Sequence, residues 1–173
     1  MSKALALINV LDKEGFIALL GPLYEHSPWA AALAFGRRPF ANHAALSAAM
    51  REAVDGASAA DQLALIRAHP ELAGEKLRRR ELTAASTGEQ ESLGLDQLDE
   101  ADLREWALLN AHYRRRFGFP FVICVRLHSR EQILAAIRSR LDVNPEAEAG
   151  EAIRQIHDIA RLRLNDLIAR LDA

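Results

Sequence analysis

Residues 146–171 read EAEAGEAIRQIHDIARLRLNDLIARL, the longest regular pattern in the chain. The pair Asn144-Pro145 stands directly before this stretch and is typical of a helix start. The apolar residues recur at helical spacing and form one broad stripe, which predicts a long final helix that packs on one side against a core. The stripe consists of Ile153, Ile156, Ile159, Ala160, Leu164, Leu167 and Leu171.

One cation interrupts this stripe. On a helical wheel Arg163 falls among the apolar residues, whereas Arg161 falls on the polar side. An arginine that faces a core is rare unless it has an anionic partner or ligand. A structural salt bridge to Glu71 or Glu89 and an anionic ligand explain Arg163 equally well.

The rest of the chain also reads as helices, many of them opened by capping residues. Ser27-Pro28 predicts an N-cap followed by a proline at the first helical position. Ser86-x-x-Glu89 and Ser129-x-x-Gln132 both match the capping box. The expected helices are Lys3–Asp12, Glu14–Leu20, Trp29–Phe35, His43–Val54, Ser58–Arg67, Thr87–Leu93, Asp99–Arg116, Arg130–Leu141 and Glu146–Leu171.

One segment differs from the helical remainder. Residues 117–125 read FGFPFVICV, and their aromatic and β-branched content favours an extended chain. No second strand-like run lies nearby, so the backbone groups must find partners outside a β-ladder. Helix ends, water or a polar ligand are open alternatives. The predicted fold is therefore all-α: residues 1–173 form a single-domain irregular bundle of about eight to ten short helices with one buried extended segment.

The composition excludes several functional classes. The chain has 173 residues, of which 50% are hydrophobic, and a net charge of −2, which is not typical of a nucleic-acid-binding surface. One cysteine, Cys124, excludes an internal disulfide and fits a reducing compartment. The sequence shows neither a signal peptide nor a membrane span, and its C-terminus lacks a peroxisomal signal. A cytoplasmic protein without nucleic-acid or membrane partners is expected.

The stretch Ala68-His69-Pro70-Glu71-Leu72 contains the first candidate catalytic group. His69 continues the apolar face of the preceding helix, and Pro70 disfavours helical geometry in the residue before it. The sequence thus predicts an inward-facing imidazole at a helix end. Imidazole titrates near neutrality and suits proton transfer, although a structural histidine that donates to a carbonyl is an equally simple explanation.

These features occur together with further short motifs in the order and spacing of one family. The motifs are Tyr24-Glu25-His26-Ser27-Pro28-Trp29, Arg38-Pro39-Phe40, Ala68-His69-Pro70-Glu71-Leu72-Ala73, Ser86-Thr87-Gly88-Glu89-Gln90, Asn110 with Tyr113, Phe117-Gly118-Phe119-Pro120-Phe121, and Ala160-Arg161-Leu162-Arg163-Leu164. Over essentially its whole length the chain resembles the 2-oxo-4-hydroxy-4-carboxy-5-ureidoimidazoline (OHCU) decarboxylases of urate degradation.

This resemblance implies an all-helical lyase that needs neither a cofactor nor a metal. It would convert OHCU to (S)-allantoin and carbon dioxide, and a homodimer is expected. The resemblance makes His69 the catalytic histidine, with Glu89 and Arg163 completing the catalytic set. The substrate-binding residues that it implies are Pro70, Ser86, Thr87, Gly88, Glu89, Gln90, Phe121, Val122, Ile123, Cys124, Val125 and Arg163.

Three other functions are less consistent with the sequence. A metal hydrolase is disfavoured because the six histidines show no ligand-like spacing such as His-x-x-x-His. A Cys124 nucleophile is disfavoured because an apolar run raises a thiol pKa. A non-enzymatic helical interaction module would show exposed apolar stripes and no inward-facing charges, whereas His69 and Arg163 are predicted to face inward.

Overall fold

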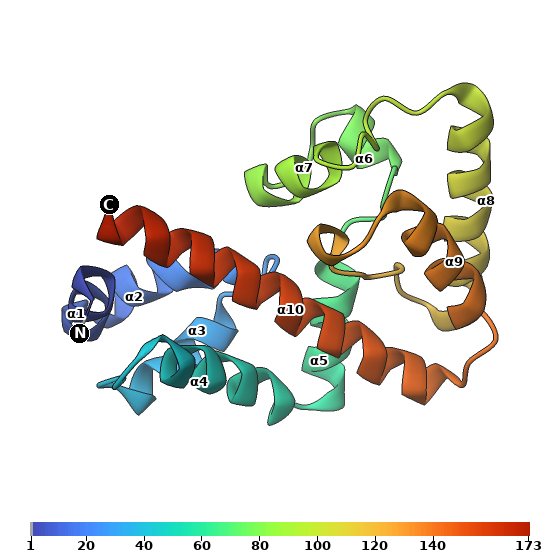
Figure 1. Ribbon diagram of the computed structural model, residues 1–173. Coiled ribbons are helices and arrows are strands. Elements are labelled where there is room, and N and C mark those ends of the chain that lie inside the picture. Colours follow the sequence, from blue (N-terminus) through green and yellow to red (C-terminus); the bar gives the residue numbers. More distant parts are fainter. Residues whose placement is uncertain (1) are drawn as a thin grey trace. The chain divides into compact units, whose positions relative to one another are not determined.

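The computed structural model describes residues 2–173, and this part of the chain forms ten α-helices, three short 3-10 helices and no β-strand (Figure 1). The predicted all-α class is therefore confirmed. The N-terminal elements are α1 (Lys3–Val10), α2 (Lys13–Leu20), η1 (Gly21–Leu23), α3 (Trp29–Ala34), η2 (Phe35–Arg37), α4 (His43–Asp55) and α5 (Ala59–Ala68). The remaining elements are α6 (Glu75–Arg78), α7 (Ala84–Glu91), α8 (Glu100–Phe117), η3 (Val125–Leu127), α9 (Arg130–Arg140) and α10 (Pro145–Asp172).

Side-chain caps explain where most of these helices begin. Asn42 accepts a hydrogen bond from the Ala45 amide at the start of α4, and Ser129 and Gln132 form the predicted capping box of α9. The predicted Ser27 cap is wrong. The N-cap of α3 is Pro28, which has no side-chain hydrogen bond, so the ring with its fixed φ takes the place of a cap.

The first compact unit contains the chain up to Ala68 together with His157–Ala173. Helix α3 packs against both α2 and α4. Phe16 of α2 is fully buried, and its ring centroid lies 5.5 Å from that of Phe35 and 6.2 Å from that of Phe40. This aromatic group fixes the chain that follows α3 onto α2.

Helix α10 contributes residues 145–156 to the second unit and the rest of its length to the first. Near its C-terminal end the Asp172 carboxylate accepts a 2.7 Å hydrogen bond from the backbone amide of Ala4, which joins the end of α10 to α1 (Figure 1). The predicted apolar stripe is confirmed, because six of its seven residues are buried: Ile153, Ile156, Ile159, Ala160, Leu164 and Leu167.

The second unit, His69–Ile156, is built around α8 and α9, which contact each other. Tyr113 of α8 is fully buried, and its ring packs against Phe117, Phe119 and Phe121 with centroid distances of 4.6, 6.1 and 5.3 Å. Gly118 ends α8 in the left-handed conformation with φ 74°, which glycine adopts without a Cβ penalty. The aromatic residues after the helix therefore turn back onto its buried face.

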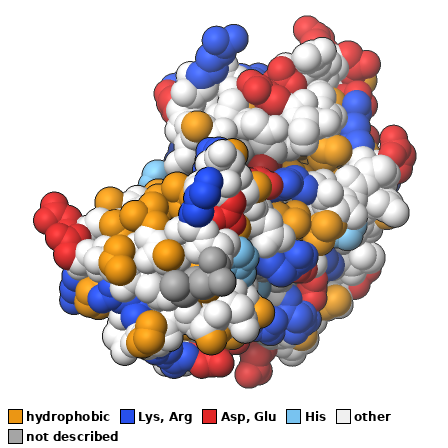
Figure 2. Space-filling view, turned by 60° about the vertical axis from the view of Figure 1, so that its left-hand side comes forward, with side chains coloured by type: hydrophobic (Ala, Val, Ile, Leu, Met, Phe, Trp, Pro, Cys, Tyr) orange, Lys and Arg blue, Asp and Glu red, His pale blue; other side chains and the backbone are white. Residues whose placement is uncertain are grey.

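Some apolar side chains remain at the surface. Figure 2 shows hydrophobic side chains gathered on one face of the molecule, bordered by charged ones. Isolated exposed apolar residues are normal in folded proteins. Within residues 2–173 no helix is long and apolar enough to cross a membrane. The large exposed apolar residues are Leu7, Val10, Leu33, Leu108 and Leu127.

Candidate active site

His69 directly follows the last residue of α5, as predicted, and opens a short irregular segment that leads to α6. Its side chain is buried, with 7% of its surface exposed. Pro70 explains the helix end, because its ring disfavours α geometry at position 69 and it has no N–H to continue the ladder. The imidazole therefore sits inside the protein at a fixed break in the backbone.

Helix α7 carries the predicted binding residues 86–90, but it starts one turn earlier than predicted. Thr83 is its N-cap and accepts a hydrogen bond from the Ser86 amide, so the proposed capping box of Ser86 and Glu89 is wrong. The Thr87 amide donates to the Thr83 carbonyl. The Ser86 and Thr87 amides, in the predicted binding stretch, are thus already bonded to Thr83.

This shift in the helix start decides which residues of α7 face inward. Ser86 and Gln90 are four positions apart and both buried, whereas Gly88 is exposed and Thr87 and Glu89 are half-buried. Without a capping role, Glu89 is a half-buried carboxylate in the middle of a helix.

Gln90 connects α7 to the segment that follows His69. Its Oε1 accepts from the Ala73 amide at 3.0 Å, and its Nε2 donates to the Glu71 carbonyl at 3.3 Å. Helix α7 also contacts η3, which follows the extended segment. Within the second unit the structure therefore brings together three predicted pieces: the segment after His69, α7 and the end of the extended segment.

The extended segment is buried and lacks β-ladder bonds, as predicted, but it is shorter than the predicted 117–125, because Phe117 ends α8, Gly118 is its C-cap and Val125 opens η3. Two side chains supply partners for its backbone: Arg140 donates from Nη1 to the Val122 carbonyl at 2.9 Å, and Gln155 Oε1 accepts from the Cys124 amide at 2.9 Å. Phe121, Val122, Ile123, Cys124 and Val125 are each at most 5% exposed. Part of the backbone assigned to substrate binding is thus occupied by the protein itself.

Arg140 is held in turn by a buried carboxylate that the sequence analysis missed. Its Nε lies 2.8 Å from Oε1 of Glu148, and Glu148 also accepts a hydrogen bond from the Tyr113 hydroxyl. Burial raises the pKa of Tyr113, which keeps the hydroxyl protonated as a donor. On a helical wheel Glu148 lies at the edge of the apolar stripe, beside Ile159, so the wheel does not single it out as it does Arg163.

Arg163 belongs to the first unit and is buried, as the helical wheel predicted, while Arg161 is exposed. Its Nη1 donates to Oε2 of Glu25 at 2.9 Å, and the two side chains are 7% and 2% exposed. Glu71, one of the suggested partners, instead accepts from Arg114 at 2.7 Å. Glu25 is thus the buried counter-charge that Arg163 required.

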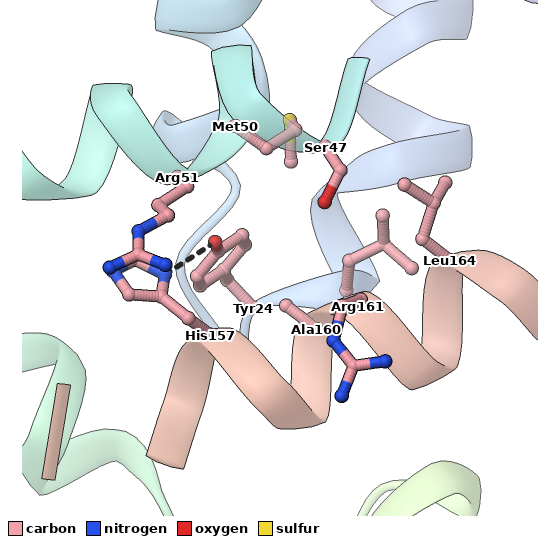
Figure 3. Close-up of a pocket in the computed structure, with 9 residues that line it drawn as sticks. Tyr24, Ser47, Met50, Arg51, His157, Ala160, Arg161 and Leu164 are labelled. Carbon is pink, nitrogen blue, oxygen red and sulfur yellow. Dashed lines mark hydrogen bonds between the residues drawn. The ribbon is translucent and has the colours of Figure 1, made fainter. Parts of the chain in front are cut away.

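A second buried polar group lies in the first unit, beside a small cavity (Figure 3). The Tyr24 hydroxyl is 3.0 Å from Nδ1 of His157, and Nε2 of His157 is 2.9 Å from Oδ1 of Asp55. Because an ionised carboxylate only accepts, Nε2 carries the hydrogen and Nδ1 accepts from Tyr24.

The cavity beside Tyr24 and His157 is too small for an organic substrate. The cavity measures about 20 Å³, space for roughly one water molecule. Burial lowers the pKa of His157, against the opposing effect of Asp55, and so favours the neutral ring. Within residues 2–173 no group of three or more His, Cys, Asp or Glu side chains is placed to hold a metal ion. The cavity beside His157 is therefore not a candidate for the substrate site.

Comparison with known proteins gives the same answer as the motifs. Residues 9–165 match the family model described as OHCU decarboxylase. The chain is 43% identical over 161 residues to the 2-oxo-4-hydroxy-4-carboxy-5-ureidoimidazoline decarboxylase of Amia calva, covering 93% of this chain and 92% of that protein. It is 44% identical over 157 residues to the protein of the same name from Haloferax volcanii, with 91% of each chain covered.

Solved structures agree with this relationship. The crystal structure of an (S)-allantoin synthase matches with a TM-score of 0.73 and 29% identity over 94% of this chain, which spans 53% of that protein. An OHCU decarboxylase crystallised in the presence of (S)-allantoin matches with a TM-score of 0.68 and 20% identity. The match covers 92% of this chain and 99% of that one, and at this identity it supports the fold alone. By its sequence match along most of its length, the chain belongs to the OHCU decarboxylase family and is an enzyme of this kind.

Proposed function

We propose that this protein decarboxylates OHCU to (S)-allantoin without a cofactor. In this proposal His69 transfers a proton, Glu89 orients the His69 imidazole and Arg163 binds the substrate. The observation that carries the proposal is the burial of His69 at a rigid helix end, next to a segment joined to α7. A buried imidazole beside a fixed backbone is preorganised for proton transfer. Family membership supplies the substrate class.

The chemistry needs no external electron sink. The carboxylate of OHCU is attached beside a ring C=N bond. When the bond to carbon dioxide breaks, its electron pair forms a carbon–carbon double bond, and the imine pair moves onto nitrogen. Loss of the neighbouring hydroxyl proton, protonation of that nitrogen and protonation of the adjacent carbon complete allantoin, so one proton is taken up overall for each carboxylate consumed.

The roles follow from what each side chain offers. An imidazole can both accept and donate a proton, so His69 suits the transfer of the hydroxyl proton or the protonation of carbon. Glu89, half-buried on α7, can accept from an imidazole N–H and fix its tautomer. Arg163 presents a planar fork suited to a carboxylate or carbonyl group, and Glu25 holds one of its nitrogens. Protonation from one side would set the stereocentre.

His69→Asn tests this proposal. The variant should retain the helical circular dichroism signal and lose about 10²-fold or more of the rate of (S)-allantoin formation. His112→Asn is the matched control, because His112 is exposed on α8 and should leave turnover unchanged. Since OHCU also decays spontaneously, the assay must follow the enantiomeric excess as well as the rate. Full enantioselective activity in His69→Asn would remove His69 from the mechanism.

A non-enzymatic interaction module fits the structure less well. It was expected to lack inward charged groups, but Arg163–Glu25 and Arg140–Glu148 are two inward ion pairs. We also propose a cytoplasmic homodimer, as the family resemblance implies. Light scattering coupled to size-exclusion chromatography should give a mass close to twice 19.1 kDa.

A further inference from the structure

The turn after His69 is held by side chains from two helices. Gln90 of α7 bonds the Glu71 carbonyl and the Ala73 amide, as described above. Asn110 of α8 donates from Nδ2 to the Leu72 carbonyl at 2.8 Å. A carbonyl only accepts, so this contact also fixes which end of the Asn110 amide faces the turn. Backbone groups of three consecutive residues in the turn are thus hydrogen-bonded by two buried amide side chains.

The conformation of this turn is not one that its sequence favours. Ala73 has φ 52°, in the left-handed region that residues with a Cβ seldom adopt. Such a residue persists when its surroundings enforce the geometry. Here the bonds to the Glu71 carbonyl, the Leu72 carbonyl and the Ala73 amide provide that enforcement.

Asn110 has a further feature that packing alone does not explain. The side chain is 5% exposed, and its Oδ1 is buried without a hydrogen-bond partner among residues 2–173. An amide buried with only one end bonded costs free energy that an apolar residue of the same shape would avoid. The contribution of Asn110 is therefore its one bond to the Leu72 carbonyl.

We infer that Asn110 is a positioning residue that holds His69 in place through the Leu72 carbonyl. This rests on the proposed catalytic role of His69. Only Pro70 and Glu71 separate His69 from Leu72, and the proline ring fixes φ at position 70, so a fixed Leu72 leaves the imidazole little freedom to move. The Glu71 carboxylate is bonded to Arg114, also on α8, at 2.7 Å. Helix α8 thus holds the turn at two successive residues.

Asn110→Leu is the first test variant, because leucine matches the shape of asparagine but cannot donate. Asn42→Leu is the matched control: it removes a hydrogen bond from an asparagine side chain at the N-cap of α4, in the first unit. Steady-state kinetics and histidine side-chain NMR are measured on both, with the His69 resonances assigned from His69→Asn. We expect kcat to fall about tenfold or more in Asn110→Leu with KM changed less than about threefold, because misplacing a reacting group acts on turnover.

The NMR result keeps the inference testable apart from turnover. In Asn110→Leu the His69 resonances should shift or broaden while those of the other five histidines stay as in the unmodified protein. If the unmodified protein fails to decarboxylate OHCU, the proposed function is wrong, and the His69 resonances still decide whether Asn110 positions this ring. Unchanged His69 resonances and unchanged kcat in a folded Asn110→Leu variant would overturn the inference, as would equal losses in Asn42→Leu.

Asn110→Asp provides a rescue experiment and replaces Asn110→Leu if that variant does not fold. An ionised aspartate cannot donate to the Leu72 carbonyl, but a protonated one can, and burial raises a carboxyl pKa. The ratio of kcat in Asn110→Asp to kcat in the unmodified protein should therefore rise as the pH falls, with the His69 resonances returning toward their normal positions. A ratio and resonances independent of pH would contradict the positioning role.

Discussion

The two units use their buried polar side chains differently. In the first unit these groups are titratable and bond to one another, whereas in the second unit buried amides bond to the backbone. The second unit also has a buried titratable group, in which Glu148 pairs with Arg140 and accepts from the Tyr113 hydroxyl, and Arg140 in turn bonds a backbone carbonyl. The first unit has the buried bonds Arg163–Glu25 and Tyr24–His157, with His157 also bonded to the exposed Asp55, and the buried amides of the second unit include Gln90 and Asn110.

The difference follows from the path of the backbone. The second unit contains two mostly buried irregular segments, residues 69–73 and 119–124, most of whose N–H and C=O groups lie outside any regular helix or β-ladder. In the first unit the partly buried Asn9 side chain bonds both the amide and the carbonyl of Phe40, and the Arg38 guanidinium donates to the Phe35 carbonyl. Irregular buried segments therefore require buried polar side chains that hydrogen-bond the protein backbone rather than a substrate. The second unit has these side chains.

The largest effect is expected from Arg140→Leu, which breaks both kinds of bond at once. It removes the donor to the Val122 carbonyl and leaves Glu148, only 1% exposed, without its cation. The free energy of unfolding should fall by about 3–5 kcal/mol, because the remaining carboxylate is buried and uncompensated. Urea denaturation followed by circular dichroism measures this loss.

The double variant Arg140→Leu with Glu148→Gln separates the two contributions, because glutamine removes the charge but keeps an acceptor for the Tyr113 hydroxyl. It removes the stranded charge, so it should recover part of the lost stability, leaving the cost of the unpaired Val122 carbonyl, about 1–3 kcal/mol. A double variant as unstable as Arg140→Leu alone would mean that the backbone bond, rather than the ion pair, dominates in this unit.

A smaller effect is expected from Arg163→Lys in the first unit. Lysine keeps the charge opposite Glu25 but loses the planar fork, so stability should fall by about 1–3 kcal/mol and turnover should fall as well. Arg161→Lys is the matched control, because Arg161 pairs with Asp158 at the surface and should change stability by less than about 0.5 kcal/mol. Lower stability with unchanged kcat and KM would make Arg163 purely structural.

Helix α7 provides a third comparison, between the expected cap and the observed one. Thr83→Ala should cost about 1 kcal/mol, because it removes the side chain that accepts from the Ser86 amide. Glu89→Gln should leave stability almost unchanged, since Glu89 has no capping role, and should alter the pH dependence of turnover. Thermal unfolding and pH–rate profiles measure both effects. A larger stability loss in Glu89→Gln than in Thr83→Ala would restore the capping box.

The smallest effect concerns pH and the first unit. Burial lowers the pKa of His157 from its ordinary 6.5, with Asp55 opposing the shift. The unfolded chain therefore binds a proton at this position at higher pH than the folded chain does, and stability should fall as the pH drops through 6.5. His157→Asn should lose less stability than the unmodified protein between pH 7.5 and 5.5, measured by urea denaturation. An identical pH dependence would show that this ring contributes nothing to it.

Local patterns in the sequence determined much of the fold. Helical periodicity identified the α10 stripe and placed Arg163 on its buried face, because a side chain's direction depends on its position in the helix. Proline chemistry placed His69 at a helix end, and residue type marked 117–125 as extended, which holds for residues 119–124. These predictions succeeded because each depends on residues only a few positions apart.

Tertiary structure decided the partners. Arg163 pairs with Glu25, 138 residues earlier in the chain, and no local pattern distinguishes this carboxylate from Glu71 or Glu89. Thr83 and Ser86 are both competent caps, and the helix begins at the one that leaves Ser86 and Gln90 buried. Asn110 meets Leu72 across 38 residues. A helix satisfies its own backbone, so its sequence predicts it. Irregular segments are satisfied by side chains from distant residues, and only the folded chain brings those together.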